Sequence, residues 1–328
     1  MILFILINKM GNECFKLNAE KNIEYKYNYK NIKSKYILQK LFNNLKAKKL
    51  YDIIKYNKNI MKRLDIDIND YKEYSEKYSS IEIEIKPVNN KYGHLINIKD
   101  EDKIYYHIYI NNGKKEIKRN YINKDGITKT IIKIIIDYQI KSFKDLFSYC
   151  NCIESIYFKK FCRNNINNMR CMFMGCSSLK EINLNNFNTN NVTDMGYMFS
   201  ECHLLKELNL NNFNTNNVTD MSFLFHGCSS LKVLNINNFN TNNVTRMVHM
   251  FSDCTSLEEL KLNHFNFNNV TNMGCMFYKC SSLKELNINN LNINNVTNMN
   301  YMFSNCSNEL INSIKNKYKN IKEEAFWN

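Results

Sequence analysis

Proline and glycine are scarce in this sequence, which has one proline and eight glycines in 328 residues. Both residues are typical of tight turns, so their scarcity argues against a fold of many tight turns and against a proline-rich linker. Glycine-rich loops that bind phosphate are excluded for the same reason. No apolar run approaches the ~20 residues that a membrane-spanning helix needs, so we predict no transmembrane segment. Hydrophobic residues still make up 44% of the chain, which is enough for a substantial core.

The start of the chain lacks the features of a secretory signal. Its apolar run, Ile2 to Ile7, is short, and no basic residue precedes it. Signal peptides have a cationic start and a longer apolar stretch. The sequence therefore predicts an intracellular, cytoplasmic protein, with the cell surface as the alternative.

The net charge of +14 comes from the first half of the chain. Residues 1–163 contain 33 basic and 19 acidic side chains, whereas residues 164–306 contain eight and nine. A basic region can attract nucleic acid or an anionic membrane. Here the basic residues are scattered, with no block of five or six together. We interpret the excess as a solvated surface and do not expect nucleic acid as a partner.

The second half of the chain repeats with a period of 26 residues. One unit reads FNTNNVTDMGYMFSECHLLKELNLNN, from Phe187 to Asn212, and a degenerate first unit starts near Phe143. Methionine, phenylalanine and cysteine each recur six times in constant phase without an insertion, so the array spans residues 143–306. A fixed period of this length is the signature of a solenoid. Its cysteine row is Cys176, Cys202, Cys228, Cys254, Cys280 and Cys306.

Each unit is predicted to contain a short strand and a short helix. The segment LKEINLNNF, residues 179–187, has the leucine-rich-repeat pattern L-x-x-L-x-L, with a strand around Ile182–Leu184. The segment VTDMGYMFSEC, residues 192–202, places its apolar residues three and four apart, which is typical of one face of a helix. Thr193 is the expected N-cap of that helix.

Stacking these units predicts an α/β fold, a leucine-rich-repeat-like solenoid of 26-residue strand–helix units. The strands would form a parallel sheet on one side and the helices the other side. The cysteine row would then lie on stacked helices ~8–10 Å apart. A disulfide needs Cα atoms within ~7 Å, so we predict a buried structural ladder of reduced thiols. The asparagines at 188, 214, 240, 266 and 292 are predicted to form a second ladder of side-chain amides.

The motifs FNTNNVTDM, MF-x-x-C and SSLKELN resemble the BspA-type leucine-rich repeat, which is also catalogued as the DUF285 family of surface-protein repeats. The resemblance covers about half of the chain. It implies a solenoid with an interaction or adhesion role, and it implies no active site. Many members of the family are exported, and this chain departs from them in having no clear signal peptide or anchor.

Three regions flank the array on the N-terminal side and one on the C-terminal side. Residues 1–33 give no assignment. Residues 34–75 are predicted to be helical, and ILQKLFNNL followed by KKLYDIIKYNKNIMKRL resembles an F-box; a simple helical packing domain is the alternative. Residues 80–142 are predicted to form a β-rich N-terminal cap, with NNG at 111–113 and KDG at 124–126 as turns and a last strand near 130–136 leading into the first repeat. Residues 307–328 are the predicted C-terminal capping helix.

The residues that usually perform catalysis or bind metal form no set in this sequence. Cys150 and Cys152 make a lone C-x-C without a second pair at zinc spacing. The histidines of the array fall at different positions of the unit, so we interpret them as surface variation. We therefore predict no enzymatic activity, no metal and no cofactor. The four histidines are His203, His226, His249 and His264.

The strand face of the solenoid is the expected partner-binding surface. Four glutamates in one row would make it mildly acidic. We predict a monomeric, non-enzymatic scaffold that binds a protein partner of unknown identity. The alternatives are an F-box-like substrate adaptor of a ubiquitin ligase and a cell-surface adhesin. The outward residues that we predict for the face are Glu181, Asn183, Asn185, Glu207, Asn209, Asn211, Asn235, Asn237, Glu259, Lys261, Glu285 and Asn287.

Overall fold

The computed structural model describes residues 34–43, 45, 47–111, 113–122, 130–288 and 291–327. The chain divides into two compact units, Met1–Tyr78 and Ser79–Asn328. The segment 1–33 and the predicted KDG turn at 124–126 lie outside the described residues, as does the middle residue of the predicted turn at 111–113.

The described part of the first unit is helical. Asn57 starts the third of its helices, because the side-chain oxygen of Asn57 accepts a hydrogen bond from the N–H of Ile60. The F-box-like interpretation of this region stays a prediction. The helices are α2 (Lys35–Asn43), α3 (Ala47–Ile54), α4 (Lys58–Arg63) and α5 (Ile68–Tyr78). Their shared core is Leu38, Phe42, Ile54 and Ile60.

The second unit begins with an antiparallel sheet that joins the repeat array. Alternate residues of the central strand β1 (Ile81–Pro87) are buried, as expected for one face of a sheet packed on a core. β1 lies between β6 (Ile132–Ile136) and β7 (Ile153–Lys160), the first strand of the array. The remaining elements of this region are β2 (Gly93–His94), η2 (Asp100–Tyr105), β3 (Tyr106–Ile110), β4 (Glu116–Ile117) and β5 (Tyr121–Ile122).

The strand that joins the sheet to the array differs from the predicted one. The strand near 130–136 was expected to lead into the first repeat, but β1 pairs with β7 instead. After β6 the chain first crosses to the other side of the coil, where Ser142 forms a parallel bridge with Asn168. In the sheet, β1 therefore separates β6 from β7, the first repeat strand.

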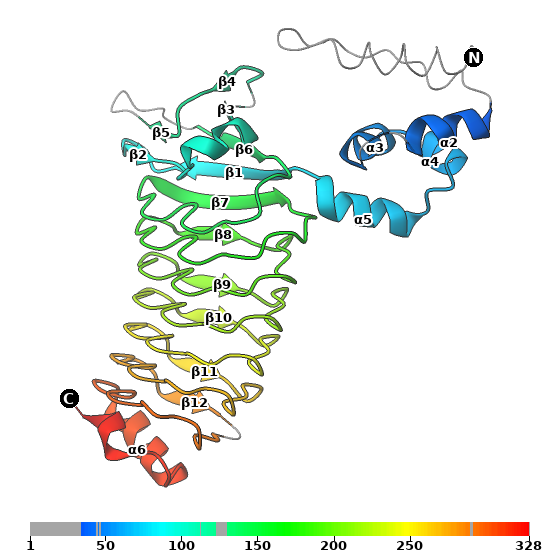
Figure 1. The fold of residues 1–328 in the computed structure, drawn as a ribbon. Coiled ribbons are helices and arrows are strands. Elements are labelled where there is room, and N and C mark those ends of the chain that lie inside the picture. The colour runs from blue at the N-terminus through cyan, green and yellow to red at the C-terminus, as the bar shows by residue number, and fades with distance from the viewer. Residues whose placement is uncertain are drawn as a thin grey trace. The chain divides into compact units, whose positions relative to one another are not determined.

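The array consists of coils that each contribute one short strand. These strands are parallel, lie 26 residues apart and pair in register, β7 with β8, β9 with β10, and β11 with β12. Figure 1 shows the coils from β7 to β12 stacked in one column. The strands after β7 are β8 (Glu181–Asn183), β9 (Glu207–Asn209), β10 (Val233–Asn235), β11 (Glu259–Lys261) and β12 (Glu285–Asn287).

The predicted helix of each unit is wrong. Residues 192–202 form a series of turns, and the described part of the array contains no helix between β7 and β12. The apolar residues of the segment are buried as predicted, but Tyr197 and Glu201 have left-handed backbone with φ of 59° and 60°. The N–H of Phe199 donates to Leu224 in the next coil rather than to a residue four back. Thr193 is not an N-cap; its N–H donates to Asn167 of the preceding coil.

A continuous line of backbone hydrogen bonds replaces the helices on that side. Single-residue parallel bridges run from coil to coil without a break. Around them, the N–H groups of Met169, Cys171, Phe173 and Gly175 all donate to the following coil. A helix would satisfy these donors within the segment, whereas stacked coils satisfy them between segments. The bridged residues are Ser142, Asn168, Asp194, Asp220, Arg246, Asn272 and Asn298.

The cysteine row forms a single file in the core, as predicted. The Sγ of Cys176 donates to the carbonyl of Phe147, and every later cysteine of the row repeats this bond with the phenylalanine 29 residues earlier. All of these thiols are free, and burial raises the pKa of Cys176 and Cys228 to about 12. The predicted spacing of ~8–10 Å between units is wrong, because hydrogen-bonded coils lie ~4.8 Å apart.

Cys228→Ala is expected to lower the free energy of unfolding by about 1–2 kcal/mol, through a small cavity and the loss of one hydrogen bond. The measurement is urea-induced unfolding followed by circular dichroism. Cys275→Ala is the matched control, since Cys275 is half-buried and outside the file. It should change the stability by less than about 0.5 kcal/mol. Equal effects of the two substitutions would contradict a structural role for the file.

The C-terminal tail closes the last coil. α6 (Asn308–Lys317) buries Leu310 and Ile314, and η3 (Glu323–Phe326) follows it. The N–H groups of Tyr301 and Phe303 donate to Glu324 and Ala325, which take the place of a further coil. The ring of Phe326 stacks on Phe303 with centroids 5.6 Å apart. The tail therefore supplies both the backbone acceptors and the aromatic ring that the next unit would provide.

Candidate functional site

The strand face is the surface formed by the outward side chains of β8 to β12 and the residues just after them. Inward neighbours such as Leu184, Leu208 and Leu210 are buried. Of the predicted outward residues, nine are exposed: Glu181, Asn183, Asn185, Glu207, Asn209, Asn237, Glu259, Lys261 and Glu285. Three are half-buried: Asn211, Asn235 and Asn287.

A basic column lies beside the glutamates and is absent from the predicted set. Lys180, Lys206, Lys232 and Lys284 each precede the first residue of a strand and are exposed, and Glu258 takes the same place in one coil. The motif SSLKELN contains this signal, because both residues of its Lys-Glu pair are exposed. The face thus has a lysine column next to the glutamate column and is not simply acidic.

The asparagines of the face also shape the chain after each strand. The Oδ1 of Asn183 accepts from the N–H of Asn185 at 3.0 Å, and Asn209 does the same for Asn211 at 3.1 Å. On the first coil, the hydroxyl of Tyr157 donates to a carboxylate oxygen of Glu181 at 2.7 Å. This bond raises the pKa of Tyr157. Part of the polar face is therefore held in place before any partner arrives.

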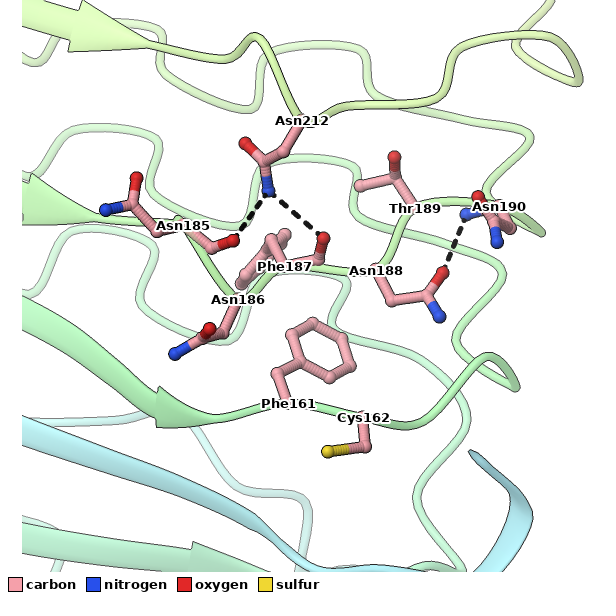
Figure 2. Close-up of a pocket in the computed structure, with 9 residues that line it drawn as sticks. All are labelled: Phe161, Cys162, Asn185, Asn186, Phe187, Asn188, Thr189, Asn190 and Asn212. Carbon is pink, nitrogen blue, oxygen red and sulfur yellow. Dashed lines mark hydrogen bonds between the residues drawn. The ribbon is translucent and has the colours of Figure 1, made fainter. Parts of the chain in front are cut away.

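An open pocket of about 320 Å³ lies beside the strand face, where the chain leaves β8 (Figure 2). Figure 2 shows the ring of Phe161 lying among the asparagine side chains. The amide of Asn212 spans the upper rim and donates to the carbonyls of Leu184, Asn185 and Phe187. The pocket is lined by Phe161, Cys162, Asn185, Asn186, Phe187, Asn188, Thr189, Asn190 and Asn212.

The pocket occurs where the asparagine ladder begins. In later coils the Oδ1 of the row residue accepts from the N–H two residues on, and its Nδ2 donates to the preceding coil, as Asn214 does to Asn190. The predicted bond of the row asparagine to backbone of its own turn is confirmed, whereas the bond between units joins its amide to a side chain of the preceding coil rather than to backbone of the next unit. In the coil before Asn188, Cys162 occupies the row position and Asn164 the position of the ladder acceptor. Asn188 still fixes its own turn but donates no amide hydrogen bond to any described residue.

Two histidines of the array, His226 and His249, are half-buried, whereas His203 and His264 are exposed as predicted. His249 is half-buried and stacks on Phe223 with centroids 4.6 Å apart, and burial lowers its pKa. The Nδ1 of His226 lies 3.7 Å from a carboxylate oxygen of Asp253. Over the described ranges, no three His, Cys, Asp or Glu side chains are grouped so that they could hold a metal ion. No helix among the same residues is long and apolar enough to span a membrane.

A protein-family model matches the repeat array twice, at residues 141–233 and 201–317, which together make up more than half of the chain. Its description is "Mycoplasma protein of unknown function, DUF285". The chain belongs to the DUF285 family. The resemblance seen in the repeat motifs is thereby confirmed.

The comparison with curated proteins found no match for this DUF285 chain. A solved leucine-rich repeat protein from Bacteroides ovatus is 18% identical, with a TM-score of 0.30. The match covers 52% of the DUF285 chain and 46% of that protein, so the chain spans less than half of its length.

The outward side chains of the DUF285 array are mainly polar and charged. No catalytic family was identified for it. Its core thiols are buried and hydrogen-bonded, and its outward residues are arranged in columns of lysine, glutamate and asparagine. Such columns can form salt bridges and amide hydrogen bonds with another molecule.

Proposed function

We propose that the DUF285 array is a protein-binding scaffold whose strand face contacts the partner. The observation that carries this proposal is the division of each coil into constant inward positions and outward positions that change. The glutamate column is interrupted by Val233, which is 55% exposed, and the asparagine column is interrupted by Lys261. A rigid core with a varied surface is the usual arrangement of solenoids that bind proteins.

The charged columns support recognition of a partner with complementary charge. Lysine and glutamate columns lie side by side along several coils, so a partner must match both of them in register. Complementary charges at an interface raise the association rate and suppress wrong partners. The exposed apolar side chain of Val233 lies in the middle of the face, which is the usual place for an anchor residue.

Reversing the charge of Glu207 and Glu259 to lysine is expected to weaken partner binding by roughly tenfold or more, because like charges at an interface cost several kcal/mol. The melting temperature should change by less than about 2 °C, since both side chains are exposed. The measurement is quantitative affinity purification from the source organism with wild-type and variant bait.

The matched control reverses Glu101 and Glu323, which are exposed and lie outside the strand face. It changes the net charge by the same amount. Proteins that are lost with the face variant and retained with the control are the expected partners. An identical set of captured proteins for all three baits would refute the strand face as the binding surface.

A further inference from the structure

The pocket beside β8 has an uncharged lining, which argues against a charged ligand. Six asparagine or threonine residues, two phenylalanines and one cysteine form it, with no acidic, basic or histidine side chain. Phosphates and carboxylates are bound by basic groups or by rows of backbone N–H groups, and hard cations by carboxylates. The lining therefore selects for a neutral ligand that can both donate and accept hydrogen bonds.

We propose that this pocket binds one neutral sugar residue of a glycan. A volume of about 320 Å³ is at the lower end of small-molecule pockets and suits a single pyranose ring. Sugar hydroxyls donate and accept, as the amide groups of the lining do. This site shares Asn185 with the strand face but does not rest on the proposed protein-binding role.

The polar groups that would contact the sugar are not consumed by the ladder. The Nδ2 of Asn188 makes no hydrogen bond to any described residue, unlike that of Asn214 in the next coil. The side chain of Asn185 is exposed after β8, and in Figure 2 its amide is turned away from the ring of Phe161. The Nδ2 of Asn188 can donate to a hydroxyl of the ring.

The floor supplies the apolar contact. Phe161 and Phe187 meet edge to face, with centroids 4.7 Å apart, and each keeps a few per cent of its surface exposed. The C–H edges of a pyranose can pack on this part of the floor while its hydroxyls reach the asparagines. Aromatic and apolar lining with a few placed polar groups is typical of small-molecule sites.

The site is preorganised, which reduces the cost of binding. Asn212 is fixed by three carbonyls, and the Oγ1 of Thr189 both donates to Asn214 and accepts from its N–H. The Oδ1 of Asn188 is fixed by the N–H of Asn190 at 3.1 Å. Few side-chain rotamers remain to be frozen when a ligand enters.

The test uses the full chain and saturation-transfer NMR with methyl glycosides of glucose, galactose, mannose and N-acetylglucosamine. We expect transfer from at least one glycoside. Asn188→Asp keeps the turn acceptor but removes the free donor, so the dissociation constant should rise about tenfold. Asn266→Asp, at the same ladder position three coils away, should leave binding unchanged.

Cys162 supplies a second readout, because it is exposed and lines the pocket. The bound glycoside should slow alkylation of Cys162 by N-ethylmaleimide, followed by peptide mass spectrometry, and should not slow alkylation of Cys275. Protein alkylated at Cys162 should no longer show transfer. The Glu207 and Glu259 double variant should bind the glycoside normally, which separates this site from the strand face.

Three results would overturn the proposal. One is the absence of transfer from every glycoside. Another is equal binding by wild type, Asn188→Asp and the alkylated protein. The third is Cys162 protection by N-acetylasparagine amide and not by any glycoside, which would assign the pocket to a side chain of a protein partner.

Discussion

Phe225→Ala is expected to lower the free energy of unfolding by about 3–5 kcal/mol. Phe225 is fully buried and lies in the middle of a file of stacked rings, with Phe199 on one side at 6.0 Å and Phe251 on the other at 5.6 Å between centroids. Removing one ring leaves a cavity that the neighbouring coils cannot fill, because their backbones are fixed to each other by hydrogen bonds. The measurement is urea-induced unfolding followed by circular dichroism.

Phe326→Ala is the matched control for the same ring stack. Phe326 is the last member of the file, is only partly buried and contacts one ring, Phe303. Phe326→Ala should lower the free energy of unfolding by less than half as much as Phe225→Ala does, because the tail can relax around the lost ring. If both substitutions lowered stability equally, the cost would not come from enclosure between two coils. Stability in solenoids is carried by interfaces between neighbouring units, so an interior interface should matter most.

Arg163→Met is expected to raise the free energy of unfolding by about 1–4 kcal/mol, since a buried charge without an ion partner is replaced by an apolar side chain of similar length. Arg163 is fully buried. One guanidinium nitrogen donates to the carbonyl of Asp137 at 2.8 Å, while its Nε and Nη2 have no hydrogen-bond partner in the part of the chain that the structure describes. Burial lowers the pKa of Arg163 to about 10.

The sign of this effect follows from the pKa. The folded-state pKa lies below the ordinary value of 12.5, so the protonated form that exists at neutral pH is disfavoured by folding. The next three coils have threonine at this position, and Thr189 satisfies its hydroxyl within the array. Arg163→Ala is the control, because it removes the charge but leaves a cavity. It should raise the free energy of unfolding by less than Arg163→Met does. A lower stability of Arg163→Met than of wild type would show that the arginine is paired.

The inward positions of the array could be predicted from sequence, whereas the backbone between them could not. Met195, Met198, Phe199 and Cys202 are all buried, as their spacing indicated. Spacings of three and four also fit turns that coil around a core, so the pattern alone favoured a helix that does not form. The left-handed residues that distinguish the two, such as Tyr197 and Phe223, are not glycines and gave no signal.

The candidate sites were predictable to different extents. Alternation along each strand identifies the outward residues of the strand face, and the lysine column, although it is present in the motif SSLKELN, is absent from the predicted set. The pocket could not be predicted from sequence, because it depends on the contact between two coils. Only the stacked structure shows that the Nδ2 of Asn188 makes no ladder bond to a described residue, although Asn164 stands 24 residues earlier, at the acceptor position of the later coils.

The sequence by itself determined the period, the inward rows and the stacking, because each row of identical side chains can be buried only against its own copies in the neighbouring units. Tertiary structure decided how the segment after each asparagine turn would satisfy its N–H groups. Within one unit a helix and a coil bury the same residues. Once a second unit lies ~4.8 Å away, its carbonyls accept those hydrogen bonds, and the coil is the conformation that presents the N–H groups to them.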